Sequence, residues 1–516
     1  MYFVDNIELN ISTYKIEFLI ECDQELSIIL KSKEKEMKEK LKKEYQIIFN
    51  EISNEKKYHI EISIPKCDNY QIYLEGLDYY MVKDYIFKDK ETKESITKLD
   101  ILNLNKIKEN LEKNKSSYKF PLISNTFNHE EIFAIQKFIT SGKKLTLGNE
   151  VETFEKEFAE YIGTPYAVMV NSGSSANLLA VACIMNYLFQ GKLEEGDEII
   201  VPTLCWSTTV WPLLQYNLKP VFIDVDIETM NIDHNKIIEK ITPRTKGIML
   251  VHVMGNSCNM EKIMKIVEEY NLLLIEDTCE SLGTYYDGKM VGTFGTFGTY
   301  SFYYSHHITT IEGGMVCCKT KEHYDLLRSL RAHGWTRYLD EKEQKLYKDT
   351  YPDIDNRYMF INLGYNLRPI ELNAVMGKIQ LRKLKQKNEN RIYNFNSIKN
   401  KILNHPKNDN IFILPREENK SISAWFGLCI FLNEKYKEKY NNFIKYLEDN
   451  SIENRPVITG NFTRQPYFKI NKFNYNPLEY PNADYIHYNG FYIGLSCEKY
   501  TDKEINELVE ILFHFF

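Results

Sequence analysis

The stretch VMVNSGSSANLLAVACIMNYL (168–188) predicts a strand, a turn and a helix, and the same unit recurs through most of this chain. It begins with an apolar run, passes through a polar Gly/Ser turn and continues as an apolar helix. Further apolar runs follow, separated by helical stretches: EIIVP (198–202), PVFIDV (220–225), GIMLVHV (247–253) and LLLIED (272–277). Short buried strands that alternate with helices are typical of a mostly parallel α/β sheet. We therefore predict a large α/β domain over residues 120–375.

The regions on either side of this domain have different patterns. Past residue 370 a long polar helix leads into a smaller α/β domain, which we place at 376–516. Residues 91–119 are rich in Lys, Glu, Asn and Ser, and they predict a charged linker that is helical or flexible.

The first 90 residues predict a β-rich accessory domain. Apolar and polar residues alternate, as in half-buried strands, in YKIEFLIEC (14–22), YHIEISIPKC (58–67) and YQIYLEGLDYYMVKDYIF (70–87). Between the first two, residues 31–46 predict an exposed helix, although YQIIFNEI (45–52) fits a strand equally well.

The composition is that of a globular protein, with 516 residues, of which 43% are hydrophobic and 27% charged. A net charge of −7 argues against a broad basic surface, so we expect no nucleic-acid partner. We see no secretory signal and no apolar stretch near the roughly 20 residues that a membrane-spanning helix needs. Ten cysteines, mostly isolated in apolar segments, indicate buried reduced thiols. We therefore expect a cytoplasmic protein with no membrane partner.

Two polar features follow predicted strands, and each has an ordinary alternative. The turn from Asn171 to Asn177 opens onto a helix amino terminus, where backbone N–H groups and the helix dipole favour an anion. An ordinary strand-to-helix turn explains it as well. Asp277 ends an apolar run, where it would face the ligand crevice of an open α/β sheet and pair with a protonated ring nitrogen. The alternative is that it caps a following helix.

The segment GTYSFYYSHHITTIEGG (298–314) places two adjacent histidines before a Gly-Gly turn. A lone histidine in such a place is more often structural than catalytic. Two histidines suggest a metal, but adjacent residues of a strand point to opposite faces. No cysteine or carboxylate lies at zinc-motif spacing from them, so we predict no metal site.

Five segments in order carry a resemblance to a known family: NSGSSANLLA, EGDEIIVP with the tryptophan that follows it, IEDTCESLG, SFYYSHHITTIEGG and GYNLRPIELNA. Together they resemble the sugar-nucleotide aminotransferase family, over roughly residues 120–516. The resemblance implies the fold-type-I architecture of pyridoxal-phosphate (PLP) enzymes, with a mostly parallel large-domain sheet and a small carboxy-terminal α/β domain. It also implies a homodimer with shared active sites.

The resemblance assigns seven residues to cofactor binding. These are the phosphate contacts Ser174, Ser175 and Ser301, the ring-stacking Trp206, the ring-nitrogen partner Asp277, Glu280 near the ring hydroxyl, and Asn366. Asn366 would reach the phosphate of the neighbouring subunit. An electron-sink cofactor itself requires an anion cradle, a flat partner and a carboxylate on its ring nitrogen.

Substrate contacts are predicted less sharply. His333, Arg337 and Arg455 are candidates for lining the pocket or binding a diphosphate or glutamate, and Arg464 is a further candidate. Ordinary surface salt bridges explain the arginines equally well.

One departure from the family pattern points to the reaction. Most members carry a lysine in S-F-x-x-x-K-x-x-T-x-x-E-G-G that binds the cofactor covalently, and here His306 occupies that position. The nearest lysines, Lys289 and Lys319, lie 17 residues before and 13 after it. Histidine cannot form an imine, but it can move protons near neutral pH. This exchange resembles the 3-dehydratase branch, and SHHITTIEGG is most similar to members that act on a GDP-linked sugar.

A second type of enzyme in this branch carries an iron–sulfur cluster, with a tight cysteine group after the histidine segment. This chain has no cysteine between Cys318 and Cys429, whereas such a cluster needs about four well-placed thiolates. We therefore expect PLP and pyridoxamine phosphate as cofactors, without an iron–sulfur cluster.

By the same resemblance, L-glutamate donates an amino group to the cofactor, and His306 then acts as a general base while the C3 hydroxyl of a nucleotide-linked 4-keto-6-deoxy sugar leaves. The product is a 4-keto-3,6-dideoxy sugar for surface polysaccharide, with ammonia released. The residues leave open the nucleotide and whether the sugar is a hexose or a heptose. Two alternatives remain: an aminotransferase with an unusual base, and a non-catalytic regulatory protein that binds PLP.

Overall fold

The computed structural model describes residues 113–124 and 126–516, together with residues 106–108, 110, 111 and seven short strands nearer the amino terminus. The chain divides into two compact units, Met1–Lys113 and Asn114–Phe516. The predicted bounds at residues 90, 119 and 375 remain predictions.

The first unit is β-rich in the part that the structure describes. Its strands are β1 (Tyr2–Asp5), β2 (Ile16–Glu21), β3 (Glu25–Leu30), β4 (Ile47–Ile52), β5 (Lys57–Ile62), β6 (Ile86–Asp89) and β7 (Ser95–Ile96). They pair antiparallel as β1-β6-β7, β2-β3 and β4-β5. Of the two possibilities for 45–52, the strand is therefore the one observed. The predicted helix at 31–46 and most of the strand at 70–87 lie outside the described residues.

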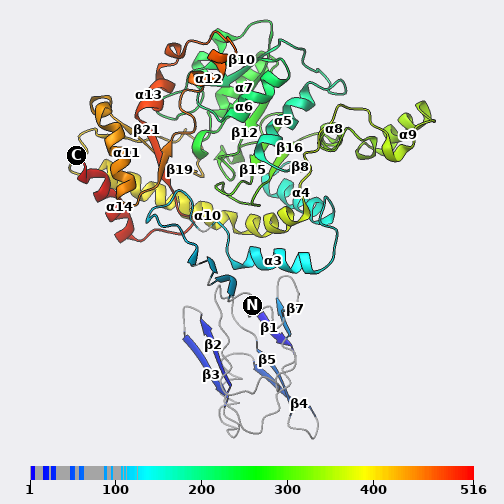
Figure 1. The fold of residues 1–516 in the computed structure, drawn as a ribbon, viewed down its shortest axis with the longest axis vertical. Helices are drawn as coiled ribbons and strands as arrows, with labels where there is room; N and C mark the ends of the chain where they lie inside the picture. Colours follow the sequence, from blue (N-terminus) through cyan, green and yellow to red (C-terminus); the bar gives the residue numbers. More distant parts are fainter. Residues whose placement is uncertain are drawn as a thin grey trace. The chain divides into compact units, whose positions relative to one another are not determined.

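A seven-stranded sheet forms the centre of the second unit (Figure 1). Its order is β10-β9-β11-β12-β15-β16-β8, and all of its strands run the same way except β16. The strands are β8 (Tyr166–Val170), β9 (Glu198–Pro202), β10 (Lys219–Ile223), β11 (Thr245–Val251), β12 (Leu273–Asp277), β15 (Phe297–Ser301) and β16 (Gly314–Cys318). The predicted mostly parallel sheet is confirmed.

Helices flank this sheet: α4 (Asn149–Ile162), α5 (Gly173–Ile184), α6 (Ser207–Gln215), α7 (Met260–Glu269) and α8 (Lys321–Arg331). Two more helices of this part are α3 (His129–Thr140) and α9 (Glu341–Thr350), the latter extending away from the sheet (Figure 1). Helix α5 is apolar on all sides and is buried along most of its length, as expected for a helix inside a core. Helix α7 instead buries Met260, Ile263 and Ile266, one face of a helix that Asn259 caps by accepting from Lys262 N at 3.1 Å.

The carboxy-terminal part is built on a smaller antiparallel sheet, ordered β17-β19-β21-β20. Its strands are β17 (Phe412–Ile413), β19 (Gly427–Leu432), β20 (Asn454–Pro456) and β21 (Gly490–Gly494), with helices α11 (Tyr440–Asp449), α12 (Pro466–Ile470), α13 (Pro481–Asn489) and α14 (Asp502–His514). The predicted long polar helix is α10 (Glu371–Leu403), which packs against α3 and α4 and against α14 (Figure 1). A third small sheet joins β13 (Tyr285–Tyr286), β14 (Lys289–Met290) and β18 (Ser421–Ile422).

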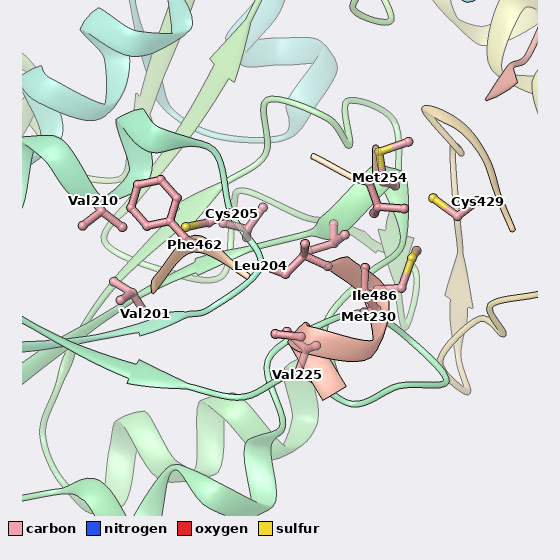
Figure 2. Packing of buried hydrophobic residues seen from close by; sticks show 14 of the residues in the cluster. Val201, Leu204, Cys205, Val210, Val225, Met230, Met254, Cys429, Phe462 and Ile486 are labelled. Carbon is pink, nitrogen blue, oxygen red and sulfur yellow. The ribbon is translucent and has the colours of Figure 1, made fainter. Parts of the chain in front are cut away.

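One hydrophobic cluster unites the two larger sheets. Val201 and Leu204 near β9 belong to the same cluster of buried residues as Phe462 and Ile486 of the carboxy-terminal part (Figure 2). A fully buried side chain of this kind contributes roughly 1.5–3 kcal/mol. The shared core therefore holds residues 114–516 together as one compact unit.

Two further expectations concern membrane-spanning helices and the state of the cysteines. In the described part of the chain, no helix is long and apolar enough to cross a membrane. The eight cysteines of the described residues are free thiols, and seven of them are buried.

Candidate active site

The carboxyl ends of four parallel strands bring predicted site residues to one edge of the large sheet. Strand β8 leads into the turn at 171–177, β9 leads to Trp206, β12 ends at Asp277, and β15 ends at Ser301. Hydrogen bonds cross between these segments: Asn177 Nδ2 and Thr209 Oγ1 each donate to Asp277 Oδ2 at 2.8 Å.

The Asp277 carboxylate is buried and held from three sides. Besides those two donors, Cys279 N donates to its Oδ1 at 3.2 Å, and Thr299 Oγ1 in turn fixes Asn177 by donating to its Oδ1 at 2.6 Å. The residues that follow Asp277 form turns, not a helix, so the helix-cap alternative is wrong. An oriented, acceptor-only group at this point suits a protonated ring nitrogen.

The amino terminus of α5 forms a cradle beside Ser301. Ser172 caps the helix by accepting from Ser175 N at 3.0 Å, and Ser174 is exposed in the first turn. A Cβ on Gly173 would lie 2.5 Å from the Ser301 Cβ and 2.8 Å from its Oγ. Glycine therefore lets the buried Ser301 hydroxyl approach the end of the helix, where the dipole favours an anion.

The two histidines lie in the connection from β15 to β16, outside both strands. The expectation that they alternate across a strand is therefore wrong. His306 is half-buried, whereas His307 is fully enclosed. Within the described residues, no three His, Cys, Asp or Glu side chains gather to hold a metal ion.

His306 is placed to act as a neutral base. Burial lowers the pKa of its imidazole to about 4, the Arg391 charge lowers it further, and a hydrogen bond to the Cys279 backbone works in the opposite direction. Its Nδ1 atom is buried and has no hydrogen-bond partner among the described residues. A neutral imidazole with an unpaired nitrogen can accept a proton.

Glu280 lies beside Asp277, and its pKa is raised, whereas that of His306 is lowered. Burial raises the pKa of its carboxyl to about 7, the Asp277 charge adds to this, and a hydrogen bond from Met254 N, at 2.9 Å, opposes it. The site thus contains a carboxyl that holds a proton near neutrality and an imidazole that does not, and such a pair is typical of acid–base catalysis.

Trp206 precedes α6 by one residue, and its side chain is 56% exposed. Thr209, one turn further on, is bound to Asp277, so the indole stands at the same strand edge as the carboxylate. An exposed aromatic face at this edge can cover a flat ring.

The other predicted residues make contacts of their own, although Leu367 O, next to Asn366, accepts from Asn171 N at 3.0 Å at the start of the turn. Asn366 is exposed and accepts from Arg368 Nε at 2.9 Å. His333 packs edge-on against Trp335, and Arg337 lies over the Trp335 ring. Arg455 is exposed and pairs with Glu453 at 3.0 Å.

Arg464 is occupied by a two-point ion pair with Asp484, and a guanidinium held in this way is structural. The ordinary explanation of Arg464 as a salt bridge therefore agrees with its contacts.

The two lysines nearest in sequence to His306 lie by another part of the fold. Lys319 Nζ donates to Phe294 O at 2.6 Å, and Lys289 lies 4.5 Å from the centre of the Phe294 ring. Phe294 precedes β15, whereas the site follows it. Neither lysine takes the place of the missing one.

Sequence reasoning missed several residues of the site. Asn177 and Thr209 bind Asp277, and Phe426 lies 5.2 Å from the His306 ring centre. Asn177 and Thr209 stand in quoted motifs, so their polar side chains were a usable signal. Phe426 and Arg391 gave none, because they are distant in sequence and lie in unremarkable segments.

The large sheet, the cradle at α5 and the buried Asp277 agree with a comparison of the sequence with known families. The sequence profile of the DegT/DnrJ/EryC1/StrS aminotransferase family matches residues 125–513. The chain therefore belongs to this family, as the five motifs predicted.

Within this family, the chain is similar to enzymes named as GDP-sugar 3-dehydratases. The chain is 39% identical, over 77% of its own length and 99% of the relative, to GDP-4-keto-6-deoxy-D-mannose 3-dehydratase of Yersinia pseudotuberculosis. It is similar, at 36% identity and a TM-score of 0.70, to the solved Escherichia coli enzyme of that name with bound hydrated PLP, covering 77% of this chain and 100% of that one. A structure of the dehydratase with a trapped PLP-glutamate geminal diamine is 37% identical, with a TM-score of 0.70, over 76% of this chain and 100% of that chain.

Proposed function

We propose that this protein is a PLP-dependent 3-dehydratase of a nucleotide-linked 4-keto-6-deoxy sugar, with GDP-4-keto-6-deoxymannose or a heptose analogue as substrate and L-glutamate as amino donor. The 4-keto-3,6-dideoxy product would serve surface polysaccharide synthesis. The observation that carries the proposal is His306, a histidine at the family's lysine position in a site whose other parts are present. The dehydratases among the relatives support the substrate.

The residues present fit the cofactor. The α5 terminus with Ser174, Ser175 and Ser301 would hold its phosphate, Trp206 would cover its ring, and the oriented Asp277 carboxylate would face its ring nitrogen. When bound, PLP supplies an electron sink for the carbon–hydrogen and carbon–oxygen bonds that break. By keeping the ring nitrogen protonated, Asp277 strengthens that sink.

His306 moves the proton. Because its imidazole is neutral at physiological pH, it can accept the proton that the elimination releases, and the resulting imidazolium returns that proton to the departing C3 hydroxyl, which leaves as water. General acid–base assistance of this kind contributes typically 10²–10⁴-fold. Without a lysine amine to displace the aminated sugar, elimination has time to occur.

The experiment is to incubate the protein with PLP, L-glutamate and GDP-4-keto-6-deoxymannose and to determine the product mass and free ammonia. We expect a dideoxy product that has lost the C3 oxygen, with one ammonia for each sugar. An amino sugar without ammonia would instead identify an aminotransferase. Tight PLP binding with no product from either the hexose or the heptose substrate would indicate a regulatory protein.

We propose in addition that the enzyme is a homodimer with shared sites. In the 20 residues of sequence before the exposed Asn366, six large apolar side chains are exposed in one protomer: Leu346, Tyr351, Ile354, Tyr358, Phe360 and Leu363, the last being 91% exposed. Exposed apolar side chains so dense along the chain favour a protein interface, and a second copy would bury them and bring Asn366 to the neighbouring phosphate. Sedimentation of the wild type should give a dimer, and Leu363→Asp should weaken it. A wild-type monomer with full activity would contradict the proposal.

A further inference from the structure

A short segment, residues 423–426, joins the carboxy-terminal sheet to both titratable groups of the site. It lies between β18 and β19, and Ser423, Ala424 and Trp425 are fully buried. The ring of Phe426, its last residue, lies 5.2 Å from the His306 ring and 6.0 Å from the His307 ring. On its other side Phe426 N donates to Met254 O at 2.8 Å, and Met254 N donates to Glu280.

The segment is held firmly in place. Ala424 N donates to Thr284 Oγ1 at 3.0 Å, and Arg391 Nη1 donates to Phe426 O at 3.0 Å. The Trp425 ring stacks on Phe395 with 3.7 Å between the ring centres and 8° between the planes. Trp425 has a φ of 28°, which a side-chain-bearing residue adopts only when its surroundings enforce it. The segment is thus a rigid support against which the histidine connection can rest.

His307 makes the direct bond to this support. Its Nε2 lies 3.1 Å from Ala424 O, and because a carbonyl only accepts, Nε2 carries the hydrogen. The His307 Nδ1 is buried and has no partner among the described residues, and the ring is 1% exposed. An enclosed ring cannot reach a substrate, so its one hydrogen bond is its contribution.

We propose that His307 is a positioning residue: by donating Nε2–H to Ala424 O, it fixes the connection at 303–310 to the 423–426 segment and so holds His306 against Phe426. This deepens the proposed dehydratase function and rests on it.

The groups that face His306 agree with such a role. They are His307 and Tyr303 from its own connection, Arg391 from α10, and Cys279 from the turn after β12; Asp277, which ends β12, and Glu280 lie within two residues of Cys279 in sequence. Arg391 also binds Cys497 Sγ, at 3.4 Å, so its charge is fixed close to both rings. If the connection came away from Phe426, His306 would gain water, and its imidazole would become easier to protonate.

The test compares two variants of the full chain. His307→Leu keeps the volume and removes the donor, whereas His307→Gln places an amide N–H near the position of Nε2. Deuterium exchange at the imidazole C2 carbon, followed by mass spectrometry over a pH series, gives the titration midpoint of His306 with PLP bound and without it. This readout needs no turnover.

We expect the His306 midpoint in His307→Leu to rise by about one pH unit, a tenfold change in its acid constant, with the midpoint in His307→Gln near the wild-type value. In assays of turnover, His307→Leu should lower kcat about tenfold with KM for the sugar unchanged and move the acid limb of the pH profile upward, and His307→Gln should restore both. An unchanged midpoint in folded His307→Leu, or a His307→Gln that behaves like His307→Leu, would overturn the proposal.

A third variant, Thr284→Val, covers the case in which His307→Leu does not fold. Thr284→Val removes the acceptor of the Ala424 amide and loosens the same segment from outside the site. It should raise the His306 midpoint in the same direction, and no change would count against the proposal. The midpoint is measured without sugar, so the two proposals can fail separately. A wild type that does not dehydrate the sugar would refute the proposed function, whereas the exchange result tests the role of His307.

Discussion

At the residue scale, the exchange of lysine for His306 predicts how the cofactor is held. Borohydride reduction of the wild type with bound PLP should leave no covalent adduct, because an imidazole forms no imine. The matched variant His306→Lys should trap the cofactor on residue 306, and peptide mass spectrometry reads both results. His306→Asn should bind the cofactor normally but dehydrate 10²–10⁴-fold more slowly, since only the proton transfer is removed. A stable adduct on a lysine of the wild type would refute the assignment.

The Glu280 carboxyl predicts a pH-dependent stability. Its pKa is raised to about 7 by burial, so the folded protein binds this proton more tightly than the unfolded chain does. The resulting stabilisation is complete below the ordinary value of 4.5 and is lost as the pH rises through 7.

Glu280→Gln is neutral at every pH and can still accept from Met254 N. On protein freed of PLP, we expect the thermal midpoint of the wild type to fall relative to that of Glu280→Gln between about pH 5 and pH 8, by the equivalent of about 1–2 kcal/mol. If the two stability curves run parallel over this range, burial does not raise the pKa of the Glu280 carboxyl, and the prediction is wrong.

At the element scale, the cradle at the start of α5 makes Gly173 irreplaceable. In Gly173→Ala the new Cβ would lie 2.5 Å from the Ser301 Cβ, so the helix end and Ser301 must move apart. We expect the affinity for PLP, followed by absorbance, to fall by at least about tenfold, and that for inorganic phosphate to fall with it. Ser174→Ala, which removes a single hydroxyl from an exposed position, should cost less. Equal losses in the two variants would contradict a cradle set by this close approach.

Elements with a strong local signal were the ones that the sequence predicted well. The run EIIVP coincides with β9, and all five of its residues are buried, because both faces of a strand inside a parallel sheet are covered. The reversed direction of β16 gave no such signal, since the same apolar run fits either direction. The contact between His307 and the 423–426 segment could not be predicted either. Ala424 is 117 residues from His307 in sequence, and only the folded chain brings the two together.

At the scale of the whole molecule, the two compact units predict a separable catalytic part. All of the site residues lie in the unit Asn114–Phe516, and none lies before it. The start of this unit is tied to its far end: Phe120 is buried, and its backbone bonds to Ser451 and Glu453, with Phe120 N donating to Ser451 O at 3.0 Å. A chain that begins at residue 116 keeps these contacts, whereas one that begins at residue 126 loses them.

We therefore expect the protein from residue 116 onward to keep its cofactor and its dehydration rate within about twofold, with any loss confined to assembly or stability. The accessory domain would then be a separate module, and most of its tyrosine-rich stretch at 70–87 lies outside the described residues. The shorter chain from residue 126 is the control, and removing the buried Phe120 ring should destabilise it by roughly 3–5 kcal/mol. Turnover and thermal unfolding of the two truncated proteins, compared with the full chain, check both expectations. If the protein from residue 116 is folded and dimeric but inactive, the first unit contributes to the active site, and the division of function between the units is wrong.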